Sequence, residues 1–146
     1  MSATLFESAP RAVIASPVAG TSARTRWAGR ILTGIAVLFL TFDATIKLFP
    51  NKEALEGTTA LGYQPHHLPI IGAIALVCLV LYVVPRTATL GAVLWTGYFG
   101  GAIATHLRVD NPLFTHTLFP IYVAAIIWGG LYLRDPRVRA LLRPAR

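Results

Sequence analysis

Four continuous apolar segments dominate the chain, and short polar stretches separate them. The segments cover Ile31–Phe49, Leu68–Val84, Ala88–Leu107 and Leu118–Leu133. About 20 helical residues cross a hydrocarbon core of roughly 30 Å, and only helices or closed barrels satisfy the backbone hydrogen bonds there. Because the apolar positions are continuous rather than alternating, a barrel is excluded. The pattern predicts an all-α fold, a bundle of four transmembrane helices.

Prolines and polar residues mark the ends of these segments. Pro50 closes the first segment and Pro85 the second, because proline lacks the N–H that a continuing helix needs. Asn51 can cap a short helix within residues 50–67, which form the one sizeable loop. Residues 110–112, Asp-Asn-Pro, turn the chain between the third and fourth segments.

The composition agrees with one small membrane domain. The 146 residues are 55% hydrophobic and 13% charged, whereas a soluble domain carries about 25% charged residues. Residues 1–24 are rich in Ser, Ala, Thr and Pro without sustained periodicity, so we expect a disordered cytoplasmic tail there and the membrane domain at 25–143. The single cysteine, Cys78, excludes a dithiol relay. Three tryptophans, Trp27, Trp95 and Trp128, are expected in an aromatic belt.

The net charge of +7 is informative through its placement. Lys47, Lys52 and Arg108 lie at one side of the bundle, at the ends of the first and third apolar segments. The other ten basic residues lie on the opposite side: Arg11, Arg24, Arg26, Arg30, Arg86, Arg134, Arg137, Arg139, Arg143 and Arg146. This positive-inside pattern predicts cytoplasmic termini, N-in and C-in. Because basic tails at a membrane attract anionic headgroups, we expect the lipid bilayer, and no nucleic acid, as a partner. For the localisation we expect a multi-pass protein of a bacterial inner or plasma membrane.

Small residues recur at helical spacing in the third and fourth segments. Gly97, Gly101 and Thr105 follow one another every four residues, as do Ala125 and Gly129. Lipid provides no hydrophobic drive between helices, so small residues serve to let backbones approach closely. The pattern predicts a tight contact between these two helices within the chain, with homodimer packing through the same face as the alternative.

Two ionisable residues fall inside the first segment. Asp43 and Lys47 are four residues apart and therefore share one helix face. Charged groups within a span are costly unless paired and usually serve a function. Two interpretations follow: a structural ion pair, or a carboxylate that handles a proton or a ligand. Arg108 falls on the Gly97 face by helical counting, so we expect it to point into the bundle and reach Asp43.

Polar side chains concentrate on the outer side, whereas the inner half is almost entirely apolar. All four histidines, His66, His67, His106 and His116, map to the outer side with Tyr63. A polar pocket above an apolar floor suits an amphipathic ligand such as a quinone, and the apolar inner half makes a poor channel. We expect this ligand-binding site to be lined by Asp43, Lys47, Tyr63, His106 and Arg108.

Catalytic, metal and haem sites are not indicated. The histidines have no metal-ligand spacing, and His106 and His116 fall at helix ends, which disfavours a buried bis-histidine haem. No nucleophile arrangement or phosphate-binding loop is present. The residues alone therefore indicate no catalytic motif.

Several stretches carry a resemblance to a known family. They are Phe42-Asp43-Ala44, Pro85-Arg86-Thr87, Leu90-Gly91-Ala92, Gly97–Arg108 and Trp128–Arg137. Over residues 27–143 the chain is similar to the DoxX-like family of small four-helix membrane proteins. That family takes its name from a small subunit linked to thiosulfate:quinone oxidoreduction.

Two functions of different classes follow. The first is an accessory subunit of a quinone-linked membrane redox system, working with a redox partner protein. In it, Lys47 and Arg108 would favour an anionic form of the ligand, and His106 or Asp43 would move protons. The alternative is a non-catalytic scaffold or assembly partner, recognised through residues 50–67 or the small-residue face. A carrier of a small solute or proton is a weaker third, because the inner half lacks polar residues.

Overall fold

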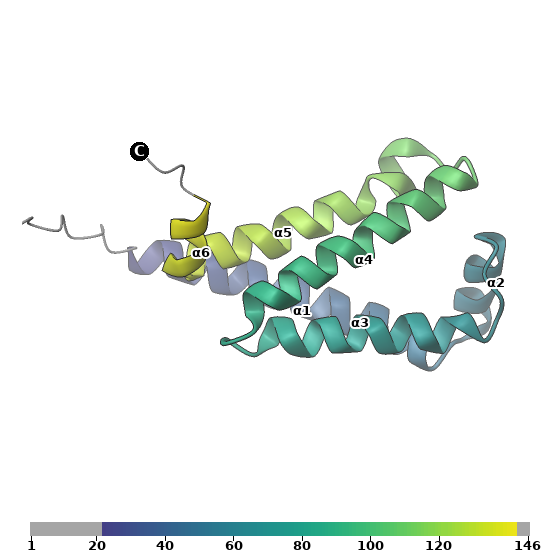
Figure 1. The fold of residues 1–146 in the computed structure, drawn as a ribbon, viewed down its shortest axis with the longest axis horizontal. Helices are drawn as coiled ribbons and strands as arrows, with labels where there is room; N and C mark the ends of the chain where they lie inside the picture. Colours follow the sequence, from purple (N-terminus) through teal and green to yellow (C-terminus); the bar gives the residue numbers. More distant parts are fainter. Residues whose placement is uncertain (1–21, 143–146) are drawn as a thin grey trace, which may run out of the picture.

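Every regular element in the described part of the chain, residues 22–142 of a computed structural model, is helical (Figure 1). The elements are α1 (Ala23–Leu48), α2 (Lys52–Ala60), α3 (His67–Val83), α4 (Ala88–Arg108), η1 (Leu113–Thr117), α5 (Phe119–Arg134) and α6 (Pro136–Leu141). The predicted all-α fold is confirmed. The predicted tail, 1–24, lies outside the described residues apart from its last three positions, and α1 begins at Ala23.

The predicted helix ends are confirmed where proline and Asn51 marked them. The Asn51 Oδ1 atom accepts a hydrogen bond of 2.8 Å from the Ala54 N–H and starts α2. α1 ends at Leu48, just before Pro50, and α3 ends at Val83, just before Pro85. The turn after α4 contains Asp110 with a positive φ of 55° and leads into the short π-helical turn η1, which the sequence pattern did not predict.

The four long helices run side by side and alternate in direction. α1 packs along α3 and α5, and α4 packs along the same two helices. Figure 1 shows that α4 and α5 diverge from α1 and α3 toward the end where α2 lies. We call this the α2 end, and the opposite end, near both chain termini, the terminal end.

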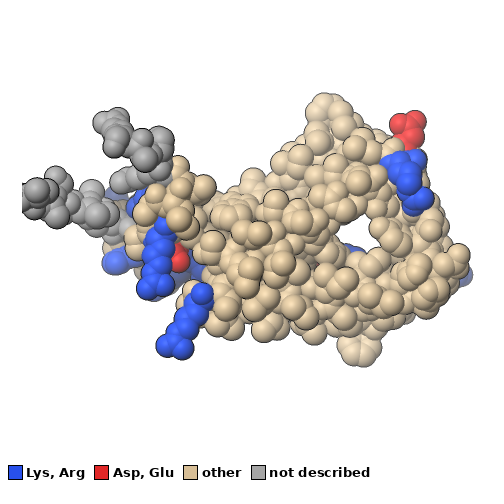
Figure 2. Space-filling view, in the orientation of Figure 1, with Lys and Arg blue, Asp and Glu red and all other residues tan. Residues whose placement is uncertain are grey.

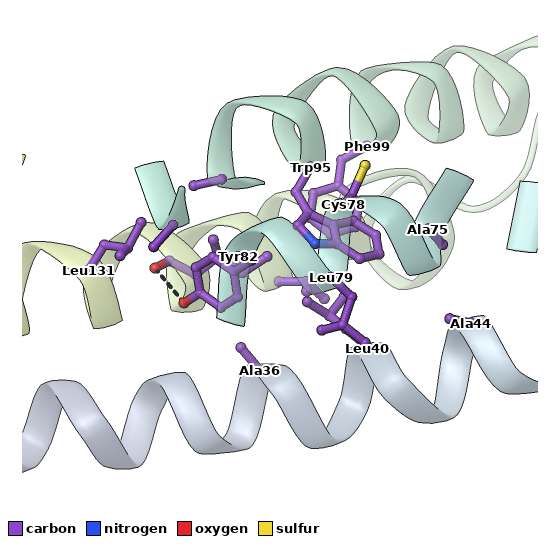
Figure 3. Packing of buried hydrophobic residues seen from close by; sticks show 14 of the residues in the cluster. Ala36, Leu40, Ala44, Ala75, Cys78, Leu79, Tyr82, Trp95, Phe99 and Leu131 are labelled. Carbon is purple, nitrogen blue, oxygen red and sulfur yellow. Dashed lines mark hydrogen bonds between the residues drawn. The ribbon is translucent and has the colours of Figure 1, made fainter. Parts of the chain in front are cut away.

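The core lies where the helices converge (Figure 3). Leu40 from α1, Tyr82 from α3 and Trp95 from α4 are fully buried, and the Tyr82 hydroxyl donates a 3.2 Å hydrogen bond to the Ile127 carbonyl on α5. The placement of Trp95 in an aromatic belt is therefore wrong, because its ring stacks on Phe99 inside the core with centroids 5.2 Å apart. The other buried residues labelled there are Leu79, Ala75, Cys78, Ala44, Ala36 and Leu131.

Close helix approach occurs at glycines that the spacing did not single out. A Cβ atom added at Gly72 on α3 would lie 2.8 Å from the Leu48 nitrogen on α1, and one at Gly29 would lie 2.9 Å from the Gly130 carbonyl oxygen on α5. Around Gly97 and Gly101, apart from the adjoining residues and the backbone of α4 itself, no atom of the described residues lies within 4 Å of the same added atom.

The expected intrachain contact through the small-residue face of α4 is therefore not formed. Gly97 lies two residues, or about 200°, around the helix from the buried Trp95, so it points outward. Gly101 and Thr105 instead line a pocket at the α2 end. On α5, a Cβ atom at Gly129 would meet only Leu32 of α1, at 3.9 Å. Ala125 and Gly129 thus do not meet the glycines of α4.

Two helical stretches are long and apolar enough to cross a membrane, judged by length and composition within residues 22–142. They are Ala23–Leu48 and Leu113–Arg134, with mean hydropathies of 1.8 and 1.4. Only 17% and 33% of their apolar windows are buried inside the structure, which leaves side chains such as Leu38 and Phe42 exposed. α3 is apolar but shorter, with 17 residues. Four apolar segments thus yield two candidate spans by these measures.

Candidate functional site

Two adjoining pockets occupy the space between the diverging helices at the α2 end. Their volumes are about 320 and 510 Å³, within the range of roughly 300–1,000 Å³ typical of small-molecule sites. We name the smaller the inner pocket and the larger the outer pocket. Figure 2 shows an opening into the molecule near this end. Both pockets are closed on one side by α2 and the residues that follow it.

The inner pocket has an apolar body and a polar rim. Its apolar lining comes from Leu61, Leu68, Ile71, Ile74, Tyr98, Gly101 and Ala102, and its polar lining from Lys47, Thr58, Tyr63, Thr105 and His106. The Tyr63 hydroxyl lies 2.9 Å from the Thr105 hydroxyl, which also donates to the Gly101 carbonyl. The Lys47 ammonium lies 5.7 Å from the centre of the Tyr98 ring. An amphipathic molecule would find an apolar surface and several hydrogen-bonding groups here.

The outer pocket is the more polar of the two. Asp43, Lys47, His106, Asn111 and His116 line it. Lys47 and His106 also line the inner pocket, together with Thr58, Leu61 and Leu68. These shared side chains form the boundary between the two pockets. A group bound in the inner pocket would therefore contact the Lys47 ammonium and the His106 imidazole, which also line the outer pocket.

Asp43 and Lys47 form the ion pair that their spacing predicts. The Lys47 ammonium contacts both carboxylate oxygens of Asp43. Neither side chain is fully buried: 23% of the Lys47 side chain and 29% of the Asp43 side chain are exposed. Lys47 is held in this half-buried position because Gly72 lets α3 approach the α1 backbone at Lys47 and Leu48. Lys47 therefore lies at the wall of both pockets, and Asp43, at the wall of the outer pocket, orients its ammonium.

His106 is oriented by a neighbour that follows it in the chain. The Asn111 amide nitrogen lies 2.8 Å from Nδ1 of His106. Because an amide nitrogen can only donate, Nδ1 accepts, and the neutral ring carries its proton on Nε2. The His116 ring lies 5.9 Å away between ring centroids, tilted by 60°. His106 can thus offer an N–H donor from the boundary of the pockets.

Arg108 is not where helical counting placed it. α4 does extend to Arg108, but its side chain is exposed and its Nη2 donates a 2.6 Å hydrogen bond to the Leu61 carbonyl. Arg108 lines neither pocket, and the expected contact with Asp43 is absent. The reason is the outward rotation of the face of α4 that carries Gly97, on which Arg108 also lies.

The structure thus brings four of the five predicted site residues together and assigns Arg108 a different neighbour. Asp43, Lys47, Tyr63 and His106 all line the pockets, whereas the prediction overlooked Asn111 and Tyr98. Tyr98 lies one helical turn before Ala102 and two turns before His106, so the same helical counting could have found it. Within residues 22–142, no three His, Cys, Asp or Glu side chains come together as a group that could hold a metal ion.

A comparison with protein families shows to which family this chain belongs. The sequence model of the DoxX-like family matches residues 31–130. The chain belongs to the DoxX-like family. The matched range contains both pockets of the DoxX-like protein in full and most of the long helices. No curated protein and no solved structure matches the chain. Family membership and the two long apolar helices indicate that this DoxX-like protein associates with a membrane.

Proposed function

We propose that this DoxX-like protein is an accessory subunit of a quinone-linked membrane redox system, with the quinone headgroup held in the inner pocket. The observation that carries the proposal is the composition of that pocket: an apolar body with Lys47, Tyr63, Thr105 and His106 at its rim. A quinone combines a ring bearing two oxygen atoms with an apolar tail. An apolar site with a few convergent polar groups suits such a molecule.

The residues present match that ligand group by group. The Lys47 ammonium and the Nε2–H of His106 can donate hydrogen bonds to ring oxygens, and hydrogen bonds from a charged donor are the stronger kind. Asp43 fixes the ammonium from the outer pocket. Tyr98 and Ile74 provide apolar surface for the ring and the first part of the tail. The outer pocket gives His106 polar neighbours through which a proton could leave.

We further propose that four helices span a bacterial inner or plasma membrane, with both termini in the cytoplasm. Basic side chains support this orientation, because they gather at the terminal end (Figure 2). The arginines of the described residues at that end are Arg24, Arg26, Arg30, Arg86, Arg134, Arg137 and Arg139. The positive-inside rule would then place the pockets at the outer leaflet, within reach of a membrane-dissolved quinone.

Binding of decylubiquinone to the protein in lipid nanodiscs tests the function. We expect Lys47→Met to weaken binding roughly tenfold, because a hydrogen bond to a charged group is worth about 1.5 kcal/mol or more. Lys52→Met is the matched control, since the Lys52 side chain is 85% exposed and lines neither pocket. Asp43→Asn should weaken binding less than Lys47→Met. Equal affinities for all variants would rule out this site.

A scaffold or assembly role is the second candidate, and the open face of α4 favours it. Gly97 and Gly100 leave this face uncovered by the described residues, so another helix could approach it closely. The partner would be a redox protein or a second copy of the chain. This role predicts a stably co-purifying protein or a dimer that Gly97→Leu disrupts. A monomer free of partners after mild solubilisation would contradict it.

A further inference from the structure

We propose that Arg108 is a positioning residue that fastens residues 50–66 as a strap across the two pockets. In this proposal the strap narrows the way into the pockets, and its detachment from the end of α4 speeds the entry and exit of a ligand. The identity of the ligand rests on the proposed function above, whereas the strap and its fastening do not. The proposal replaces the expectation that Arg108 touches the ligand itself.

The strap forms a wall of both pockets without belonging to the core. Thr58 and Leu61 line both pockets, and Tyr63 lines the inner one. Yet α2, which makes up most of the strap, has no buried residue. In Figure 1 it lies apart from the long helices, beyond the point where they diverge. Apolar packing therefore contributes little to holding the strap in place.

Two long-range side-chain hydrogen bonds join the strap to the last two turns of α4. Arg108 Nη2 donates to the Leu61 carbonyl at 2.6 Å, and the Tyr63 hydroxyl lies 2.9 Å from the Thr105 hydroxyl. Both partners on α4 lie within four residues of its end. Detaching the strap would break these two bonds and expose the pockets, while the helices of the core keep their contacts.

Gly62 provides the room in which the Arg108 guanidinium lies against the strap. Gly62 has a positive φ of 83°, a backbone conformation that residues other than glycine rarely adopt. A Cβ atom there would lie 2.8 Å from Arg108 Nη2. Glycine thus lets the guanidinium lie directly on the strap backbone, next to the Leu61 carbonyl to which it donates.

The arrangement has a kinetic consequence that a ligand contact would not have. Arg108 lines neither pocket, so its loss leaves the ligand contacts in place. Loosening the strap should raise the association and dissociation rates together and leave the Kd nearly unchanged. A residue that contacts the ligand would instead change Kd, mostly through the dissociation rate.

Hydrogen exchange of the protein in nanodiscs, with no ligand added, tests the strap directly. We expect Arg108→Gln to speed exchange of the amides of residues 52–63 by about tenfold, because a charged hydrogen bond is lost. Gly62→Ala should also speed it, because alanine is strained at the positive φ of this position. Amides in the cores of α3 and α4 should exchange as before. Tyr63→Phe removes the other fastening and should produce a smaller local rise. Lys52→Gln, on the exposed side of the strap, is the matched control and should change nothing.

Stopped-flow mixing with decylubiquinone supplies the second readout. Both rate constants should rise several-fold in Arg108→Gln and Gly62→Ala, with Kd within about twofold of wild type. The proposal is overturned if strap exchange is unchanged in these variants, or if it rises equally in all helices. Absence of quinone binding to the wild type would refute the proposed function, whereas the exchange result would still decide the strap.

Discussion

Alanine should have opposite effects on the stability of the protein at Gly72 and at Gly97. A Cβ atom at Gly72 would lie 2.8 Å from the Leu48 nitrogen and 2.9 Å from the Lys47 carbonyl carbon. These neighbours are backbone atoms of α1, so they cannot move away by changing a rotamer. Alanine at this position must push α1 and α3 apart by several tenths of an ångström. At Gly97, alanine would enter open space.

The expected free energies follow from these distances. Overpacking between well-packed elements costs about 1–3 kcal/mol, whereas glycine to alanine inside a helix gains about 0.5–1 kcal/mol. Gly72→Ala should therefore lower the free energy of unfolding by about 1–2 kcal/mol. Gly97→Ala should leave it unchanged or raise it by up to about 1 kcal/mol. Because Lys47 lines both pockets, Gly72→Ala should also weaken ligand binding, and Gly97→Ala should not.

Unfolding by titration with a denaturing detergent measures both variants under identical conditions. Gly34→Ala is a further control, because the space around Gly34 within α1 is also open. Stability losses of equal size in Gly72→Ala and Gly97→Ala would refute the packing described here. A loss in Gly97→Ala alone, accompanied by dissociation of an oligomer, would show that the open face of α4 is covered by another chain.

Two further predictions concern single hydrogen bonds. Tyr82→Phe removes the hydrogen bond from the buried hydroxyl to the Ile127 carbonyl, and we expect a loss of about 1 kcal/mol in the same unfolding titration; an unchanged stability would contradict this bond. Asn51→Ala removes the cap of α2 and should speed hydrogen exchange in residues 52–56 several-fold, because such a cap is worth about 1 kcal/mol; exchange at the wild-type rate would show that the cap carries no stability.

Features that depend on neighbouring residues, such as helix ends and pairs within one helix, were predictable from the sequence. Contacts between helices were predictable only in part. Asp43 and Lys47 pair because four residues of helix bring them to one face, which needs no knowledge of the fold. The Asn51 cap and the helix ends before Pro50 and Pro85 depend on equally local chemistry. The all-α fold followed from the continuous apolar segments.

The errors concern which face of a helix points inward. Helical counting correctly places Gly97 and Arg108 on one face of α4, but the spacing of small residues suggested that this face is buried. The structure buries the face of Trp95 instead, so the glycine contact, the position of Arg108 and the belt assignment of Trp95 fail for one shared reason. Leu61 and Arg108 are 47 residues apart, and no local pattern could reveal that they meet.

Native mass spectrometry of the mildly solubilised protein, with identification of any retained small molecule, tests the central claim most directly. The account predicts a retained quinone in the wild type and its loss in Lys47→Met, with retention in Lys52→Met. A co-purified protein without any small molecule, or a quinone retained equally by Lys47→Met, would contradict a quinone site in the inner pocket.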